Sequence, residues 1–122
     1  MSIQENYHKI KAQIPENIEL VAVSKFHPVE KIKEVYDCGQ KIFGENKVQE
    51  LLTKVNELPA DIQWHLIGHL QTNKVKYIAP FIDTIQSVDS EKLLSEINKE
   101  AGKHSRIVKV LLQVKIAAEE SK

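Results

Sequence analysis

Short apolar stretches rich in β-branched residues recur along the chain at a nearly constant spacing. They begin at Leu20, Lys41, Gln63, Thr84 and Ile107. Between them, apolar residues return every three or four positions, as in Val48, Leu51, Leu52 and Val55, which is the spacing of a helix with one buried face. Parallel strands need a crossover of a dozen or more residues, usually a helix. The pattern therefore predicts an α/β fold with about five strands that alternate with helices.

Local signals predict where several of these elements end. An opening helix is expected within residues 1–14, with Ser2 and Glu5 as a capping box. Gly39 and Gly102 stand where the glycines that end two later helices would lie.

The number of units limits the architecture. Four or five such units form either an open doubly wound sheet or part of an eight-stranded barrel, and a closed barrel needs roughly 200 residues or more. The chain has 122 residues and stops at Ala-Ala-Glu-Glu-Ser-Lys, where the next helix would begin. We therefore expect a truncated chain or the first part of a larger protein. No composition shift divides residues 1–122, so they predict one partial domain, with units from 20–122 after the opening helix.

Composition and charge exclude several classes of function. Lys+Arg and Asp+Glu both number 17, so the formal net charge is zero, and interleaved acids and bases give no basic patch for nucleic acid. The sequence has no run of 18 apolar residues for a membrane span. The single cysteine, Cys38, cannot form an internal disulfide, which favours a reducing cytoplasm.

The most distinctive polar residue is Lys25, which directly follows an apolar stretch. In parallel α/β folds, chemistry gathers at the carboxyl ends of the strands. A lysine at the mouth of a pocket is partly desolvated, and its neutral amine can attack a carbonyl to form a Schiff base. A solvated lysine that merely ends a strand is the alternative.

Other strand-end residues have competing interpretations. His65 lies within the third apolar stretch and is either a hydrogen-bonded core group or a functional one. Glu45 and Asn46 follow the second stretch, where helix capping is an alternative, and Asp89 follows the fourth, where helix capping is the favoured interpretation. Metal-ligand spacings such as C-x-x-C are missing from the sequence, so no metal site is expected.

Several specific sequence motifs extend the interpretation of Lys25 and the other strand-end residues. They are Ala22-Val-Ser-Lys25 with Pro28, Phe43-Gly-Glu-Asn46, Trp64-His-Leu-Ile-Gly-His-Leu-Gln-Thr-Asn-Lys74, Ser87-Val-Asp-Ser90, and Leu112-Gln-Val114 with Glu119-Glu-Ser-Lys122. In this order they resemble the family of pyridoxal phosphate homeostasis proteins. The resemblance implies the first half of a TIM (β/α)8-barrel of the alanine-racemase N-terminal-domain type, without the second β-domain of true racemases.

The same resemblance implies a cofactor and the residues that hold it. The cofactor is pyridoxal 5′-phosphate (PLP), carried as a Schiff base on the residue that matches Lys25. Asn46 matches a residue that faces the cofactor ring, and His65, Gln86 and Ser87 correspond to positions lining the same mouth. The family's phosphate-binding loops lie in the second half, and Lys115 replaces a usual Asn. The implied role is non-enzymatic, in PLP (vitamin B6) and amino-acid homeostasis.

Two alternatives to this non-enzymatic, PLP-binding role remain. One is a PLP-dependent amino-acid racemase-like enzyme, which needs an acid/base on each face of the ring. Tyr7, Tyr36 and Tyr77 are all predicted in helices, away from the strand ends. The other is an inactive half-barrel fragment that self-associates through exposed sheet edges.

Overall fold

The computed structural model describes residues 2–114, and these form a five-stranded parallel sheet. The strands are β1 (Ala22–Val23), β2 (Ile42–Glu45), β3 (Gln63–Leu66), β4 (Thr84–Val88) and β5 (Lys109–Leu112). Their spatial order follows the sequence order without reversal, whereas doubly wound sheets reverse direction at a switch point. The predicted barrel half is therefore confirmed, and the open doubly wound sheet is excluded.

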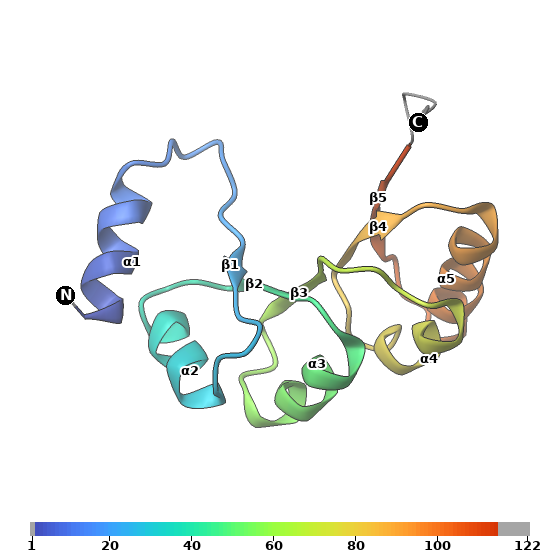
Figure 1. Ribbon diagram of the computed structural model, residues 1–122, viewed down its shortest axis with the longest axis horizontal. Coiled ribbons are helices and arrows are strands. Elements are labelled where there is room, and N and C mark those ends of the chain that lie inside the picture. The colour runs from blue at the N-terminus through green and yellow to red at the C-terminus, as the bar shows by residue number, and fades with distance from the viewer. Residues whose placement is uncertain (1, 115–122) are drawn as a thin grey trace, which may run out of the picture.

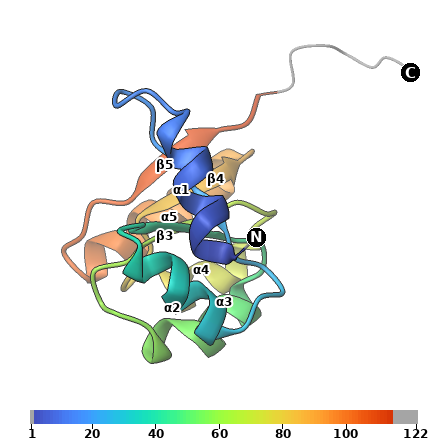
Figure 2. The same ribbon diagram turned by 90° about the vertical axis from the view of Figure 1, so that its left-hand side faces the viewer.

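The helices lie in the connections, as the periodicity predicts. They are α1 (Ile3–Ala12), α2 (Val29–Asp37), α3 (Val48–Lys54), α4 (Val75–Ile78) and α5 (Glu91–Lys103), with short 3-10 turns η1 (Val55–Glu57) and η2 (Thr72–Lys74). Figure 1 shows α2, α3, α4 and α5 on one side of the sheet. The opening helix α1 lies beside α2 at the β1 end (Figures 1 and 2). No helix among the described residues is long and apolar enough to span a membrane.

The register of the strands separates the two faces of the sheet. One row of paired residues consists of Glu45, Leu66, Ile85 and Val110. It faces the helices, and Leu66 and Ile85 belong to the buried core. The neighbouring row consists of Val23, Gly44, His65, Thr84 and Lys109. Because successive strand residues point to opposite faces, this second row lies on the helix-free face.

Of the three helix ends predicted from the sequence, two are confirmed and one is wrong. Ser2 and Glu5 form the predicted capping box, and Gly39 follows α2 with a φ of 110°. The prediction that Gly102 ends the last helix is wrong, because α5 continues to Lys103. Ser105 takes the left-handed conformation instead, with a φ of 51°. The Arg106 N–H then donates to the Ala101 carbonyl at 3.0 Å, as in a Schellman motif.

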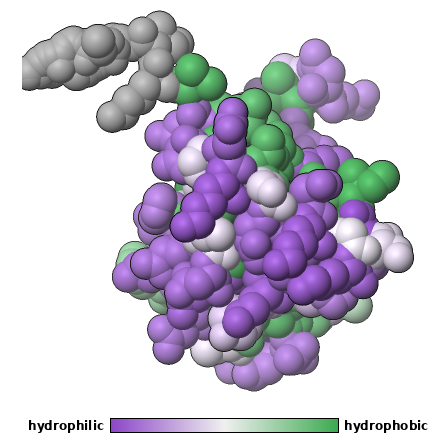
Figure 3. All heavy atoms as spheres, turned by 90° about the vertical axis from the view of Figure 1, so that its right-hand side faces the viewer, coloured by the Kyte–Doolittle hydropathy of each residue, from purple (hydrophilic) through white to green (hydrophobic). Residues whose placement is uncertain are grey.

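Large hydrophobic side chains are exposed around the last strand. From the α5 side the surface is mainly hydrophilic, with hydrophobic residues grouped in patches (Figure 3). Those exposed at and around β5 are Ile107, Leu111, Leu112 and Val114. We use the term β5 patch for these four residues. A sheet edge with exposed apolar residues is a site at which another chain can pair.

Candidate functional site

A tight turn after β1 carries Lys25. The His27 N–H donates to the Ser24 carbonyl at 3.1 Å, so residues 24–27 form a β-turn. Phe26 occupies its third position with a φ of 68°, a conformation that turns normally assign to glycine or asparagine. The Phe26 side chain is 77% exposed, whereas Lys25 is half-buried. The turn thus holds Lys25 at the carboxyl end of β1, where the sequence predicts it.

Lys25 and two other candidates share a face and a level of the sheet. Each stands two residues beyond the row that contains Val23, Gly44 and Thr84. These candidates are Lys25, Asn46 and Gln86. Gln86 lies within β4, and Lys25 and Asn46 follow the ends of β1 and β2. Extending the alternation of side chains past these strand ends assigns all three to the helix-free face. Within residues 2–114, no carboxylate forms an ion pair with Lys25.

Asn46 is fixed by a close approach to the end of β3. A Cβ atom added to Gly68 would lie 2.3 Å from the Asn46 carbonyl oxygen and 2.4 Å from its Oδ1. Only a glycine permits that approach. Neither Asn46 nor Glu45 caps the following helix, because Lys47 holds the N-cap position of α3. The capping alternative for these two residues is therefore wrong.

His65 and Gln86 form a pair between β3 and β4. The Nδ1 atom of His65 lies 3.0 Å from Nε2 of Gln86, and its Nε2 lies 3.5 Å from the Asp83 carboxylate. His65 is only 8% exposed. Burial lowers the pKa of His65 below 6.5, and the opposing effect of Asp83 is smaller. His65 is thus hydrogen-bonded within the sheet, and its neutral form is favoured.

This pKa shift predicts a pH dependence of stability. A histidine whose pKa is lowered by folding binds more protons when unfolded, so the free energy of unfolding decreases as pH falls below about 6.5. Urea unfolding at several pH values should show a shallower decrease for His65→Gln than for the unchanged chain. His69 is the matched control because its side chain is 72% exposed. An identical slope in His65→Gln would contradict the prediction.

Ser87 is joined to the same region through Gly68. Its hydroxyl donates to the Gly68 carbonyl oxygen at 2.5 Å, so Ser87 and Asn46 both contact this glycine. Asp89, for which capping was expected, does not cap α5. The Ser90 hydroxyl does so by accepting from the Leu93 N–H at 3.1 Å, and Asp89 lies 4.0 Å from His69.

The sequence interpretation missed a buried ionic cluster beneath the turn. Glu45 is fully buried and Lys54 is 6% exposed. The Lys54 ammonium donates to the carboxylates of Glu45 and Glu50, both at 2.8 Å, and to the Ser24 carbonyl at 2.9 Å. We call Glu45, Glu50 and Lys54 the acid–lysine cluster. One signal was available, since Lys54 follows Leu51 by three residues and so lies on the apolar face of α3.

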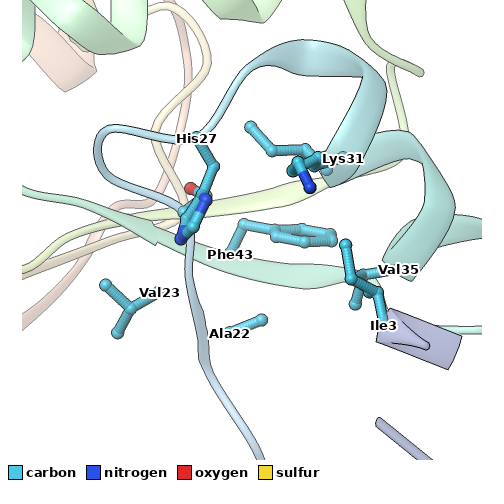
Figure 4. A pocket seen from close by; sticks show the side chains of 9 residues that line it. Ile3, Ala22, Val23, His27, Lys31, Val35 and Phe43 are labelled. Atoms are coloured by element: carbon cyan, nitrogen blue, oxygen red, sulfur yellow. The ribbon is translucent and has the colours of Figure 1, made fainter. Parts of the chain in front are cut away.

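A pocket near the turn lies apart from the candidate residues. It has a volume of about 170 Å³ and opens between α1, α2 and β1 (Figure 4). Its lining includes Ile3, Val35 and Phe43 with His27 and Lys31, and Lys25 does not belong to it. Among residues 2–114, no group of three or more His, Cys, Asp or Glu is placed to hold a metal ion. Lys115 lies outside the described residues.

The donors on the helix-free face fit a carbonyl-bearing ring. A lysine amine can bond covalently to an aldehyde carbon, and the amides of Asn46 and Gln86 offer both donors and acceptors to ring substituents. Lys25 and Asn46 follow the carboxyl ends of the neighbouring strands β1 and β2, and Gln86 lies within β4. Barrel proteins bind ligands at the carboxyl ends of their strands. The arrangement suits PLP better than it suits a metal ion.

Comparisons with known proteins agree with this arrangement. Residues 1–119 match the family described as alanine racemase, N-terminal domain. The pyridoxal phosphate homeostasis protein of Aquifex aeolicus is 46% identical over 105 residues, which cover 85% of this chain and 46% of that protein. The predicted resemblance is thereby confirmed. The chain spans about half the length of the curated relatives it matches.

Solved structures include a protein determined with PLP. PipY of Synechococcus elongatus PCC7942, with PLP bound, has a TM-score of 0.88 and 42% identity, over 96% of this chain and 56% of PipY. The structure of PipY without PLP has a TM-score of 0.90 and 41% identity, over 99% of this chain and 57% of PipY. Alanine racemase from E. faecalis is similar in fold alone, with a TM-score of 0.75 and 18% identity, over 97% of this chain and 33% of that enzyme.

Proposed function

Because the chain belongs to the alanine racemase N-terminal domain family, we propose that it binds PLP through a Schiff base with Lys25. Its role is non-enzymatic, in intracellular PLP (vitamin B6) and amino-acid homeostasis, within the cytoplasm that its single cysteine favours. The observation that supports the proposal is the register Val23↔Gly44, since Lys25 and Asn46 each stand two residues beyond this pair, after the carboxyl ends of β1 and β2. A PLP-bound relative at 42% identity supports it.

The proposed chemistry assigns a task to each candidate residue. The neutral Lys25 amine adds to the aldehyde carbon; a C=N bond forms, and the aldehyde oxygen leaves as water with both amine protons. Asn46 faces the cofactor ring. Gln86 and Ser87 line the same mouth, and His65 orients Gln86 through their 3.0 Å contact. The resemblance assigns the phosphate-binding loops to the second half of the family's fold, so we expect residues 1–122 by themselves to bind PLP weakly.

The positions of the tyrosines in the described residues favour a non-enzymatic role over a racemase. Racemisation needs a proton donor or acceptor on each face of the ring. Within the described part of the chain, all three tyrosines lie in helices, and two have assigned partners. The Tyr7 hydroxyl donates to Gln40 at 2.8 Å, and the Tyr36 hydroxyl donates to Asp61 at 2.5 Å. Incubation with L-alanine and PLP should therefore yield no D-alanine.

Lys25→Ala tests the proposal directly. The chain is mixed with PLP and reduced with borohydride, and the modified lysines are located by peptide mass spectrometry. We expect Lys25 to take the adduct in the unchanged chain and the variant to lose that adduct, because alanine has no amine. Lys33→Ala is the control, since Lys33 is an exposed helix residue paired with Asp37. Adducts spread evenly over many lysines would contradict an organised site.

Self-association is a second candidate property, and the β5 patch favours it. Ile107 is 93% exposed and Val114 is 70% exposed, and they precede and follow β5, an edge strand of the sheet in the described residues. We propose that this edge pairs with a second copy of the chain. Light scattering over a range of concentrations should show growth in mass, and Leu111→Lys should suppress it. A mass that stays monomeric at all concentrations would contradict this second proposal.

A further inference from the structure

We infer that the acid–lysine cluster is a positioning device that fixes the turn at residues 24–27 and thereby the place of the Lys25 amine. This inference rests on the proposed function, because it explains how Lys25 is presented to PLP. The cluster contains no residue of the candidate site. Lys54 and Glu50 contact the backbone on the two sides of Lys25, and Glu45 contacts the Ser24 side chain.

On the amino-terminal side of Lys25, the contact comes from Lys54. Its ammonium donates to the Ser24 carbonyl at 2.9 Å. The remaining two donors go to Glu45 and Glu50 at 2.8 Å each, so all three donors of the ammonium are used. Because Lys54 is almost fully buried, water cannot replace these partners. The Ser24 carbonyl is therefore held in one place.

Glu45 holds the side chain of the same serine. The Ser24 hydroxyl donates to Oε2 of Glu45 at 2.5 Å, and the same oxygen accepts from Lys54. The other carboxylate oxygen, Oε1, is buried and has no hydrogen-bond partner among the described residues. A buried carboxylate with one satisfied oxygen is costly unless a cation stays beside it. The ion pair of Glu45 and Lys54 is therefore bonded to Ser24, which follows β1.

On the carboxyl-terminal side, Glu50 holds the backbone of Phe26. The Phe26 N–H donates to Oε2 of Glu50 at 2.5 Å, the oxygen that also accepts from Lys54. Phe26 has a φ of 68°, and a non-glycine residue in this region is strained unless its surroundings hold it. Because Phe26 is largely exposed, packing of its ring does not hold the backbone in this strained conformation. The hydrogen bond from the Phe26 N–H to Glu50 holds it.

A purely structural role for the cluster predicts a different result. In that case it would attach α3 to the sheet, and its loss would lower stability without changing which lysine reacts. A positioning role predicts that Lys25 loses its selective reactivity while the chain stays folded. The two roles are separated by measuring both quantities in the same variants.

Glu50→Ala is the principal test, because Glu50 is the least buried member of the cluster. Glu45→Gln combined with Lys54→Met is the second variant, since it removes both buried charges together. Asp37→Ala is the matched control: Asp37 also accepts from a lysine one helical turn away but is exposed. Circular dichroism establishes that each variant is folded. The PLP–borohydride label is then measured on Lys25 relative to all other lysines.

We expect Glu50→Ala to reduce the share of label on Lys25 by about tenfold, the usual effect of losing a residue that orients a functional group. Asp37→Ala should leave that share unchanged. Phe26→Gly in the Glu50→Ala background should restore part of it, because glycine adopts a positive φ without strain. Unchanged selectivity in the folded Glu50→Ala and double variants would overturn the inference.

A PLP-independent measurement separates this inference from the proposed function. Hydrogen exchange of the Phe26 amide reports the turn alone, and it should accelerate about tenfold in Glu50→Ala as its acceptor is lost. If the unchanged chain takes no label on Lys25, the proposed function fails, and Phe26 exchange still decides whether the cluster holds the turn. Equal exchange in the unchanged chain and Glu50→Ala would overturn the positioning role.

Discussion

Replacing Lys54 by methionine is expected to lower the free energy of unfolding by about 3–5 kcal/mol, because it leaves a buried carboxylate without its counter-charge. Methionine preserves the length and the apolar stem of the lysine. It removes the ammonium that lies 2.8 Å from Glu45, whose side chain is wholly inaccessible to solvent. Urea unfolding followed by circular dichroism at neutral pH measures the loss.

Two controls identify the cause of this loss. Lys33→Met breaks an ion pair of similar length, but both of its side chains are about half exposed, so we expect a change below about 1 kcal/mol. Adding Glu45→Gln to Lys54→Met removes the uncompensated charge and should recover part of the stability. Equal losses for Lys54→Met and Lys33→Met would show that burial of the pair has no energetic consequence.

The alternation of strands and helices could be predicted because it follows from burial. Each of the five apolar stretches contains a strand, since one face of each packs under the helices. Strand lengths could not be predicted as well. The stretch from Leu20 yields only two paired residues, Ala22 and Val23, whereas β5, the other edge strand, spans four residues. Hydrophobicity reports burial and does not report how far a ladder of hydrogen bonds extends.

Helix ends depended on contacts that no local pattern contains. Gly39 was predictable because its φ of 110° needs a residue without a side chain. Gly102 has ordinary helical geometry, and Ser105 takes the left-handed position after α5. The Arg106 guanidinium donates to the Ala79 carbonyl at 2.7 Å, a contact with the end of α4 that holds the chain beyond α5. That partner is distant in sequence.

Some residues of the candidate site could likewise be predicted from the sequence, and others could not. Lys25 and Asn46 could be placed from sequence because they follow strands directly, and carboxyl ends of parallel strands share one edge. The acid–lysine cluster could not, because Glu45 ends β2, Lys54 ends α3, and their partner Ser24 follows β1. Their contacts exist only after those elements pack. The roles of the candidate residues toward PLP remain predictions that labelling tests.

Replacing Gly68 by alanine is expected to destabilise the chain by about 3 kcal/mol, the upper end of what overpacking costs. The added methyl group would lie 2.3 Å from the Asn46 carbonyl oxygen, which is backbone and cannot rotate away. Either β2 or β3 must therefore shift at its carboxyl end. Because Ser87 donates to the Gly68 carbonyl, the shift would also disturb the contact between β3 and β4. Urea unfolding measures the loss of stability.

Gly102→Ala is the matched control for this substitution. A Cβ atom at Gly102 meets nothing within 4 Å, and the residue lies in α5, where alanine is favoured over glycine by up to about 1 kcal/mol. The same chemical change should therefore stabilise the chain at one glycine and destabilise it at the other. Loss of Asn46 placement in Gly68→Ala should also lower the share of PLP label on Lys25. If Gly68→Ala proves as stable as the unchanged chain, the close approach of β2 and β3 cannot be what fixes Asn46.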